Sequence, residues 1–166
     1  LSLEEENTAR FVAEKLKEIG LEAQEGIGGY GLSVLIEGKN PGSKVVALRA
    51  DMDALPIMEA NDVPYKSQNP GVMHACGHDV HTTSLLGTAK ILNQLRDEFE
   101  GSVKLVFQPA EEKAPGGASL MIKDGILENP TPASMIGQHV APGIPVGKIG
   151  FREGMYMAST DELYLT

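Results

Sequence analysis

The chain has 166 residues, a hydrophobic content of 42% and a formal net charge of -9 at pH 7. This composition predicts one main globular unit with a real core, and the acidic balance offers no basic stripe for a nucleic-acid backbone. No apolar run reaches the roughly 18 to 20 residues that span a bilayer, and the acidic start is unlike a signal peptide, so we expect a cytoplasmic protein without a membrane partner.

The first predicted elements are a helix and two strands. Ser2 and Glu5 favour a capping box, and apolar residues then recur at helical spacing until Gly20, a natural C-terminal stop. Two β-branched and apolar runs follow at residues 32–37 and 44–50. Because a turn-like stretch separates them, we expect adjacent, antiparallel strands.

The rest of the chain continues this alternation. The remaining predicted elements are a helix over residues 78–95, a strand over 103–107, a short helix over 116–123, a short strand over 134–137 and the start of a strand over 157–166. The pattern predicts an α/β fold, with a mixed sheet flanked by helices.

Polar residues follow three of the predicted strands directly. They are Asp51 and Asp53 after the second strand, Glu111 and Glu112 after the third, and His139 after the fourth. In an open α/β sheet, ligands bind at the carboxyl ends of the strands. These separate segments are therefore expected to converge on one crevice.

Residues 74–81, His-Ala-Cys-Gly-His-Asp-Val-His, contain three of the four histidines and the only cysteine. Cys76 and His78 are two apart in a glycine-containing loop and can face one ion, which predicts a metal site with a reduced thiolate ligand. His74 and His81 fit structural roles equally well. A thiolate with imidazoles favours zinc, whereas added carboxylates keep manganese or cobalt open.

The neighbouring pair Glu111 and Glu112 is expected to divide two tasks. In an extended loop, successive side chains point to opposite sides. One carboxylate can then bind the metal while the other acts as general base beside a metal-bound water and later delivers the proton to a leaving nitrogen. Taken alone, this pair would be ordinary solvated surface, and Asp51 with Asp53 could simply cap a turn.

Three ordered motifs carry a resemblance over essentially the whole chain. They are Leu-Arg-Ala-Asp-Met-Asp-Ala-Leu-Pro-Ile at 48–57, His-Ala-Cys-Gly-His-Asp-Val-His-Thr at 74–82 and Phe-Gln-Pro-Ala-Glu-Glu at 107–112. The chain resembles the amidohydrolase branch of the aminoacylase/carboxypeptidase metallopeptidases, which includes hippurate hydrolases, indole-3-acetyl-amino acid hydrolases and N-acetyl-diaminopimelate deacetylases. The resemblance implies a metallopeptidase-like catalytic domain that cleaves the amide bond of N-acyl amino acids or peptides.

The resemblance also implies the cofactors and their ligands. It predicts two divalent ions, zinc or manganese first and cobalt or nickel next, and a metal-bound hydroxide as the attacking group. The implied ligands are Cys76, His78, Glu112 and His139; Glu111 is the implied general base, Asp53 orients the site, and Asp51 stands where related branches carry a histidine ligand. The cysteine is expected to compensate for that histidine.

The chain also departs from the family pattern. Family members carry a further metal-binding histidine and a histidine from a lid domain, and all four histidines here lie elsewhere. We therefore expect residues 1–154 to be the N-terminal part of a catalytic domain and residues 155–166 the start of a lid, in a protein that forms a dimer at full length. A non-catalytic metal-binding or interaction fragment is the alternative, and a dinuclear hydrolase with a non-amide substrate is a third, weaker interpretation.

Overall fold

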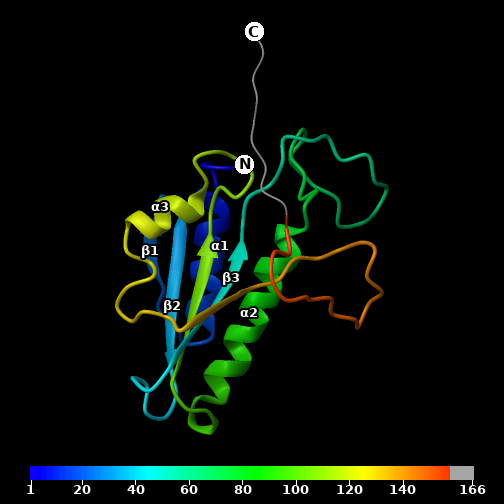
Figure 1. Ribbon diagram of the computed structural model, residues 1–166. Helices are drawn as coiled ribbons and strands as arrows, with labels where there is room; N and C mark the ends of the chain where they lie inside the picture. The colour runs from blue at the N-terminus through cyan, green and yellow to red at the C-terminus, as the bar shows by residue number, and fades with distance from the viewer. Residues whose placement is uncertain (158–166) are drawn as a thin grey trace.

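The structure is a computed structural model that describes residues 1–157, in which helices and strands alternate along the chain (Figure 1). The elements are α1 (Glu6–Glu18), β1 (Gln24–Ile27), β2 (Gly31–Glu37), β3 (Val45–Asp51), α2 (His78–Gln94), the 3-10 turn η1 (Arg96–Glu98), β4 (Ser102–Gln108), α3 (Gly117–Lys123) and β5 (Ser134–Gly137). This arrangement confirms the α/β class and the mixed sheet flanked by helices. The strand expected over residues 157–166 lies, from residue 158 on, outside the described residues.

The strands form one sheet in the order β1-β2-β4-β3-β5. The prediction that residues 32–37 and 44–50 form adjacent strands is wrong, because β4 lies between them: Leu105 is opposite Val34 of β2 and opposite Leu48 of β3. β4 is buried along almost its whole length, which suits a central strand. The expected opposite directions are correct, since β2 is antiparallel and β3 parallel to β4.

The largest hydrophobic core lies between the sheet and the pair α1 and α2. Both helices place apolar side chains there, among them Leu85 and Ala89 of α2. The main buried members are Val12, Leu16, Leu32, Val34, Ile36, Leu85, Ala89, Leu105 and Phe107. A second, smaller cluster joins Ile27 and Val106 to α3 and the residues after it. The core therefore fixes β4 and α2, the two elements next to the predicted site.

The predicted capping box at the start of α1 is wrong. Glu5 is the residue before the helix, but its side chain makes no capping hydrogen bond. Instead, Ser2 donates to Asp53, and Glu5 accepts from the backbone N–H groups of Leu3 and Ala110. Local spacing suggested a helix cap, whereas the folded chain offers both side chains partners far away in sequence.

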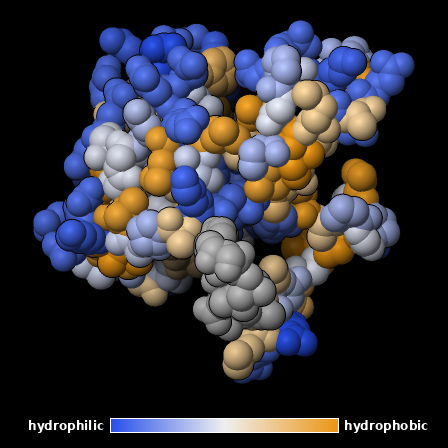
Figure 2. All heavy atoms as spheres, turned by 90° about the horizontal axis from the view of Figure 1, so that it is seen from above, coloured by the Kyte–Doolittle hydropathy of each residue, from blue (hydrophilic) through white to orange (hydrophobic). Residues whose placement is uncertain are grey.

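The three parallel strands β3, β4 and β5 end at one edge of the sheet, which confirms the predicted convergence. Figure 1 shows the arrowheads of β3 and β4 at the upper end of the sheet, with the N-terminus nearby. Figure 2 looks down on this end and shows hydrophobic as well as hydrophilic side chains at the surface. In the described part of the chain, no helix has the length and apolar character needed to cross a membrane.

Alanine substitutions at two glycines would show how closely the loop after β4 is packed. A Cβ at Gly117 would lie 1.8 Å from the carbonyl oxygen of Pro109, whereas one at Gly87, in the exposed middle of α2, would meet nothing within 4 Å. We expect Gly117→Ala to lower the free energy of unfolding by about 1–3 kcal/mol through overpacking. Gly87→Ala should raise it by about 0.5–1 kcal/mol because alanine loses less backbone entropy in a helix. Urea unfolding of both variants measures this, and equal effects would contradict the packing argument.

Candidate metal centre

A buried carboxylate, Asp53, organises the edge of the sheet. Its Oδ1 accepts hydrogen bonds from Nδ1 of His78 at 3.3 Å and the N–H of Glu111 at 3.0 Å. Its Oδ2 accepts from Oγ of Ser2 at 2.6 Å and the N–H of Glu112 at 3.0 Å. Burial alone would raise the pKa of Asp53, but the bonds from His78, Ser2 and the two amides outweigh it and hold the pKa well below its usual range. Asp53 is therefore an anion with both oxygens occupied.

His78 turns its other nitrogen toward further carboxylates. Nε2 lies 3.7 Å from Oε1 of Glu112 and 4.0 Å from Oε2 of Glu111. Neither Nε2 nor Oε1 of Glu112 has a hydrogen-bond partner among residues 1–157, although both atoms are buried. Burial would lower the pKa of His78, but the bond to Asp53 and the charges of Asp51, Asp53 and Glu112 raise it. A cation between these two unpartnered atoms would satisfy both.

The expectation that Glu111 and Glu112 point to opposite sides is wrong. Both carboxylates approach His78, because the chain bends after β4 instead of continuing extended. Ala110, just before the pair, has a φ of 48°, in the left-handed region that a non-glycine residue seldom adopts. The two side chains still differ in exposure, at 42% for Glu111 and 22% for Glu112.

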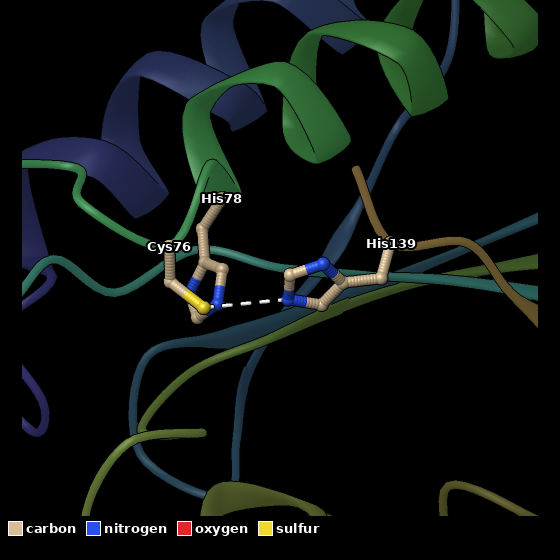
Figure 3. Close-up of side chains that lie close together, drawn as sticks. All are labelled: Cys76, His78 and His139. Atoms are coloured by element: carbon tan, nitrogen blue, oxygen red, sulfur yellow. Dashed lines mark hydrogen bonds between the residues drawn. The ribbon is translucent and has the colours of Figure 1, made fainter. Parts of the chain in front are cut away.

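Cys76 and His139 meet from different loops beside His78, as Figure 3 shows. The Sγ of Cys76 lies 3.3 Å from Nε2 of His139, and Nδ1 of His139 donates to the carbonyl oxygen of Val140 at 2.7 Å. That second bond requires the proton on Nδ1, which leaves a lone pair on Nε2 for the thiol or for a metal. The predicted pairing of these two segments is thus present in the fold.

The thiol of Cys76 responds to the surrounding negative charge. Burial, and after it the carboxylates of Glu112, Glu111 and Asp51, raise its pKa to about 11. The same negative potential attracts a divalent cation, and a bound cation reverses the effect on the thiol, because a coordinating thiol loses its proton. The charge pattern around Cys76 is therefore one that a cation would balance.

Gly77 lets the two loops approach closely. Its φ of 82° lies in the left-handed region, and a Cβ there would lie 2.3 Å from Cγ2 of Val140. The next turn of α2 adds His81, which is fully buried. Its Nδ1 donates to Oδ1 of Asp51 at 2.6 Å, while its Nε2 accepts from the N–H of Val140 at 2.9 Å. Both ring nitrogens are occupied, so His81 has a structural role and fixes the loop that carries His139.

Asp51 belongs to a hydrogen-bonded network. Its Oδ1 accepts from His81, and its Oδ2 binds the guanidinium of Arg49 at 2.6 Å. Arg49 in turn donates through Nε to Gln108 at the end of β4. Sequence reasoning missed Ser2, Arg49 and Gln108, because their roles depend on strand order and on a contact across 51 residues. The contact of Arg49 with Asp51 could have been predicted, because residues two apart on a strand lie on the same face of the sheet.

Three groups of potential metal donors result. They are Cys76, His78 and His139; His78, Glu111 and Glu112; and Asp51, His78 and His81. All three contain His78 with its unpartnered Nε2, and the second also contains the unpartnered Oε1 of Glu112. In the third, His81 and Asp51 are already joined by a short hydrogen bond. Donors around a tetrahedral zinc ion lie about 3.4 Å apart, close to the measured separations. The donor set thus fits one or more divalent ions, with His78 common to all groups. His74 lies outside them, and burial lowers its pKa.

Comparison with known proteins gives consistent matches. The sequence pattern of Peptidase family M20/M25/M40 matches residues 47–161. The N-acyl-L-amino acid amidohydrolase of Geobacillus stearothermophilus is 48% identical over 99% of this chain and 44% of its own length. The hippurate hydrolase of Campylobacter jejuni is 47% identical over 97% of this chain and 41% of its own. The chain thus spans about two fifths of the length of these relatives.

A solved structure matches in three dimensions as well. It is the YXEP protein of Bacillus subtilis, described as a dinuclear metal-binding peptidase from the M20 family. It is 42% identical, with a TM-score of 0.86, over 93% of this chain and 42% of that one. The chain therefore has the same fold as the matching part of the Bacillus subtilis protein.

His78 offers the sharpest test of metal binding. Because it belongs to all three donor groups, we expect His78→Ala to abolish zinc binding by the chain. The parent chain should retain at least one zinc ion after dialysis against buffer with trace zinc, as measured by metal analysis of mass-verified protein. Val80→Ala, a change at an exposed neighbour on α2, should bind like the parent. Equal zinc content in the His78→Ala variant would contradict this donor set.

We expect His81 to affect zinc affinity although both of its ring nitrogens are already hydrogen-bonded. His81→Ala removes the acceptor for the N–H of Val140 and the donor to Asp51, so the loop bearing His139 is released. We expect zinc affinity to fall about 10- to 100-fold, as is usual for residues that orient ligands. Competition with a chromophoric chelator measures this, with Val80→Ala again as the control. An unchanged affinity would show that His139 needs no support from His81.

Proposed function

The chain belongs to the peptidase family M20/M25/M40, and from this premise we propose that it forms the metal-binding part of an amidohydrolase that releases an amino acid from an N-acyl conjugate. The observation that carries the proposal is the buried, unpartnered pair of His78 Nε2 and Glu112 Oε1, beside the contact of Cys76 with His139. The names of the relatives, N-acyl-L-amino acid amidohydrolase and hippurate hydrolase, support the substrate class.

Four side chains would hold the metal: Cys76, His78, Glu112 and His139. Their donors come from the loop before α2, the start of α2, the loop after β4 and the segment after β5. We propose a dinuclear centre of zinc or manganese, with cobalt or nickel as further choices, and the dinuclear relative in Bacillus subtilis supports the number of ions. Such ions, when bound, polarise the amide carbonyl and lower the pKa of a coordinated water.

Glu111 is proposed as the general base. Its side chain is the more exposed of the pair, at 42%, and its Oε2 lies within 4.0 Å of Nε2 of His78. A carboxylate in this place can take a proton from the attacking water and later pass it to the nitrogen of the departing amino acid. Its backbone N–H is fixed by Asp53, so the carboxylate can move the proton while the loop stays in place.

Asp53 is proposed to orient His78. It binds Nδ1, which places the proton on that nitrogen and leaves Nε2 directed at the other donors. The same carboxylate binds the amides of Glu111 and Glu112, so one residue positions the base and two of the ligands.

The complete active site is proposed to need more than these residues. The chain spans about two fifths of its relatives, and residues 149–155 expose Ile149, Phe151 and Met155 at 90%, 90% and 85%. We propose that residues 1–154 form the N-terminal part of the catalytic domain, that residues 155–166 begin a lid, and that the full-length protein forms a dimer. Such apolar side chains fit a surface that further chain would cover.

A second candidate function is a metal-binding fragment without activity. It is favoured by the histidine count, because only two of the four histidines, His78 and His139, are among the four proposed ligands. Hydrolysis of an N-acyl amino acid by the 166-residue chain alone would contradict this second candidate function. A panel of amide and non-amide substrates separates the proposed amidohydrolase from a hydrolase of another class.

Replacing Glu111 or Glu112 with glutamine in the full-length protein should affect activity and metal content differently. We expect Glu111→Gln to lower kcat for N-acyl amino acid hydrolysis about 100- to 10,000-fold with metal content unchanged, because only the proton acceptor is lost. Glu112→Gln should lose metal as well as activity. Parallel kinetics and metal analysis measure both, and retained hydrolysis by Glu111→Gln would refute the proposed base.

A further inference from the structure

The N-terminal turn of the chain reaches the metal centre directly. Oγ of Ser2 donates to Oδ2 of Asp53 at 2.6 Å, across 51 residues of sequence. Oε1 of Glu5 accepts from the N–H of Ala110 at 2.7 Å, across 105 residues. Figure 1 shows the N-terminus at the same upper end where β3 and β4 finish. These two side chains are the ones that the sequence assigned to a helix cap.

We propose that Ser2 is a positioning residue of the metal centre and acts through Asp53. This inference rests on the proposed function of that centre. Asp53 accepts four hydrogen bonds, and three come from the residues that it positions, namely His78, Glu111 and Glu112. Ser2 supplies the fourth from outside that set. It is therefore the one bond to Asp53 that comes from outside the proposed ligands and base.

The loss of this bond would leave Oδ2 of Asp53 with one donor fewer. Oδ2 would keep a single donor, the N–H of Glu112, while Oδ1 would keep His78 and Glu111. A buried carboxylate with a vacated acceptor position is free to rotate toward another partner. Such a rotation would move Nδ1 of His78 and both amides together, because all three are bound to the same group.

Glu5 holds Ser2 in place. It is almost fully buried, with 2% of its surface exposed, and Oε1 accepts from the N–H of Leu3 at 3.0 Å as well as from Ala110. Ala110 is the residue with a φ of 48° that starts the bend toward Glu111. The turn is thus attached to the bend at one end through Glu5 and to Asp53 at the other through Ser2.

The fold itself does not depend on the hydroxyl of Ser2. α1 is anchored in the core by Val12 and Leu16, both fully buried, and Ser2 lies outside the helix and the core cluster. Ser2→Ala is therefore expected to keep the fold and loosen the centre. This separation makes a positioning role testable apart from loss of the fold.

The first experiment measures zinc affinity of the 166-residue chain by competition with a chromophoric chelator. We expect Ser2→Ala to weaken zinc binding about tenfold, as is typical when an orienting partner is removed. Ser2→Thr keeps a hydroxyl and should restore the parent affinity. Ser84→Ala removes a hydroxyl from an exposed position on α2 and should change nothing. An affinity that falls equally in Ser2→Thr would overturn the proposal, because the hydroxyl would not be responsible.

The second experiment needs no metal. Amide hydrogen exchange at Glu111 and Glu112 reports the hydrogen bonds to Asp53 directly. We expect faster exchange at both amides in Ser2→Ala, parent rates in Ser2→Thr, and a cooperative unfolding transition in all three proteins, which shows that the fold is kept. Unchanged exchange in Ser2→Ala overturns the positioning role, whatever the zinc data show. If the parent chain binds no zinc, the metal proposal fails for this chain while the exchange rates still decide the role of Ser2.

Discussion

The hydrogen bonds to Asp53 are the interaction on which the site depends. Four segments far apart in sequence meet at this one carboxylate: the N-terminal turn, the end of β3, the start of α2 and the bend after β4. Burying a carboxylate costs free energy unless its oxygens are hydrogen-bonded, so folding favours the assembly of the four donors around Asp53. The requirement to satisfy Asp53 thus brings the candidate ligands together before any metal arrives.

Negative charge then explains why the assembled edge favours a cation. Arg49 balances Asp51 directly, whereas among residues 1–157 Glu111 and Glu112 form no ion pair with a lysine or arginine. Burial and the carboxylates raise the pKa of Cys76, and the bond to Asp53 and the nearby carboxylates raise that of His78, so both groups hold their protons more tightly than in water. A divalent ion that displaces those protons would neutralise the carboxylates and satisfy the unpartnered atoms at once.

The sequence predicted those features that depend on local pattern. Strand ends followed by acidic or imidazole residues, and a Cys-Gly-His loop that opens a helix, fixed the position of the site without knowledge of strand order. The insertion of β4 between β2 and β3 could not be read in this way, since it depends on competition among strands for the central position. Ser2 and Glu5 were misread because their spacing satisfies a local rule, while their actual partners, Asp53 and Ala110, lie far away in the sequence. The bend at Ala110 could not be predicted either, because alanine rarely adopts a positive φ and its presence gives no sign of one.

The loops that carry Glu111, Glu112 and His139 are held in the same way. In each, a buried acceptor binds the backbone N–H groups of the loop: Asp53 binds the amides of Glu111 and Glu112, Glu5 binds that of Ala110, and His81 binds that of Val140 next to His139. The loops are thereby fixed while the side chains remain free to bind an ion or move a proton. A change in a ligand should therefore leave its loop in place, whereas a change in an acceptor should move a loop whose ligand is intact. The acceptors are as much a part of the centre as the donors, although none of them needs to touch the metal.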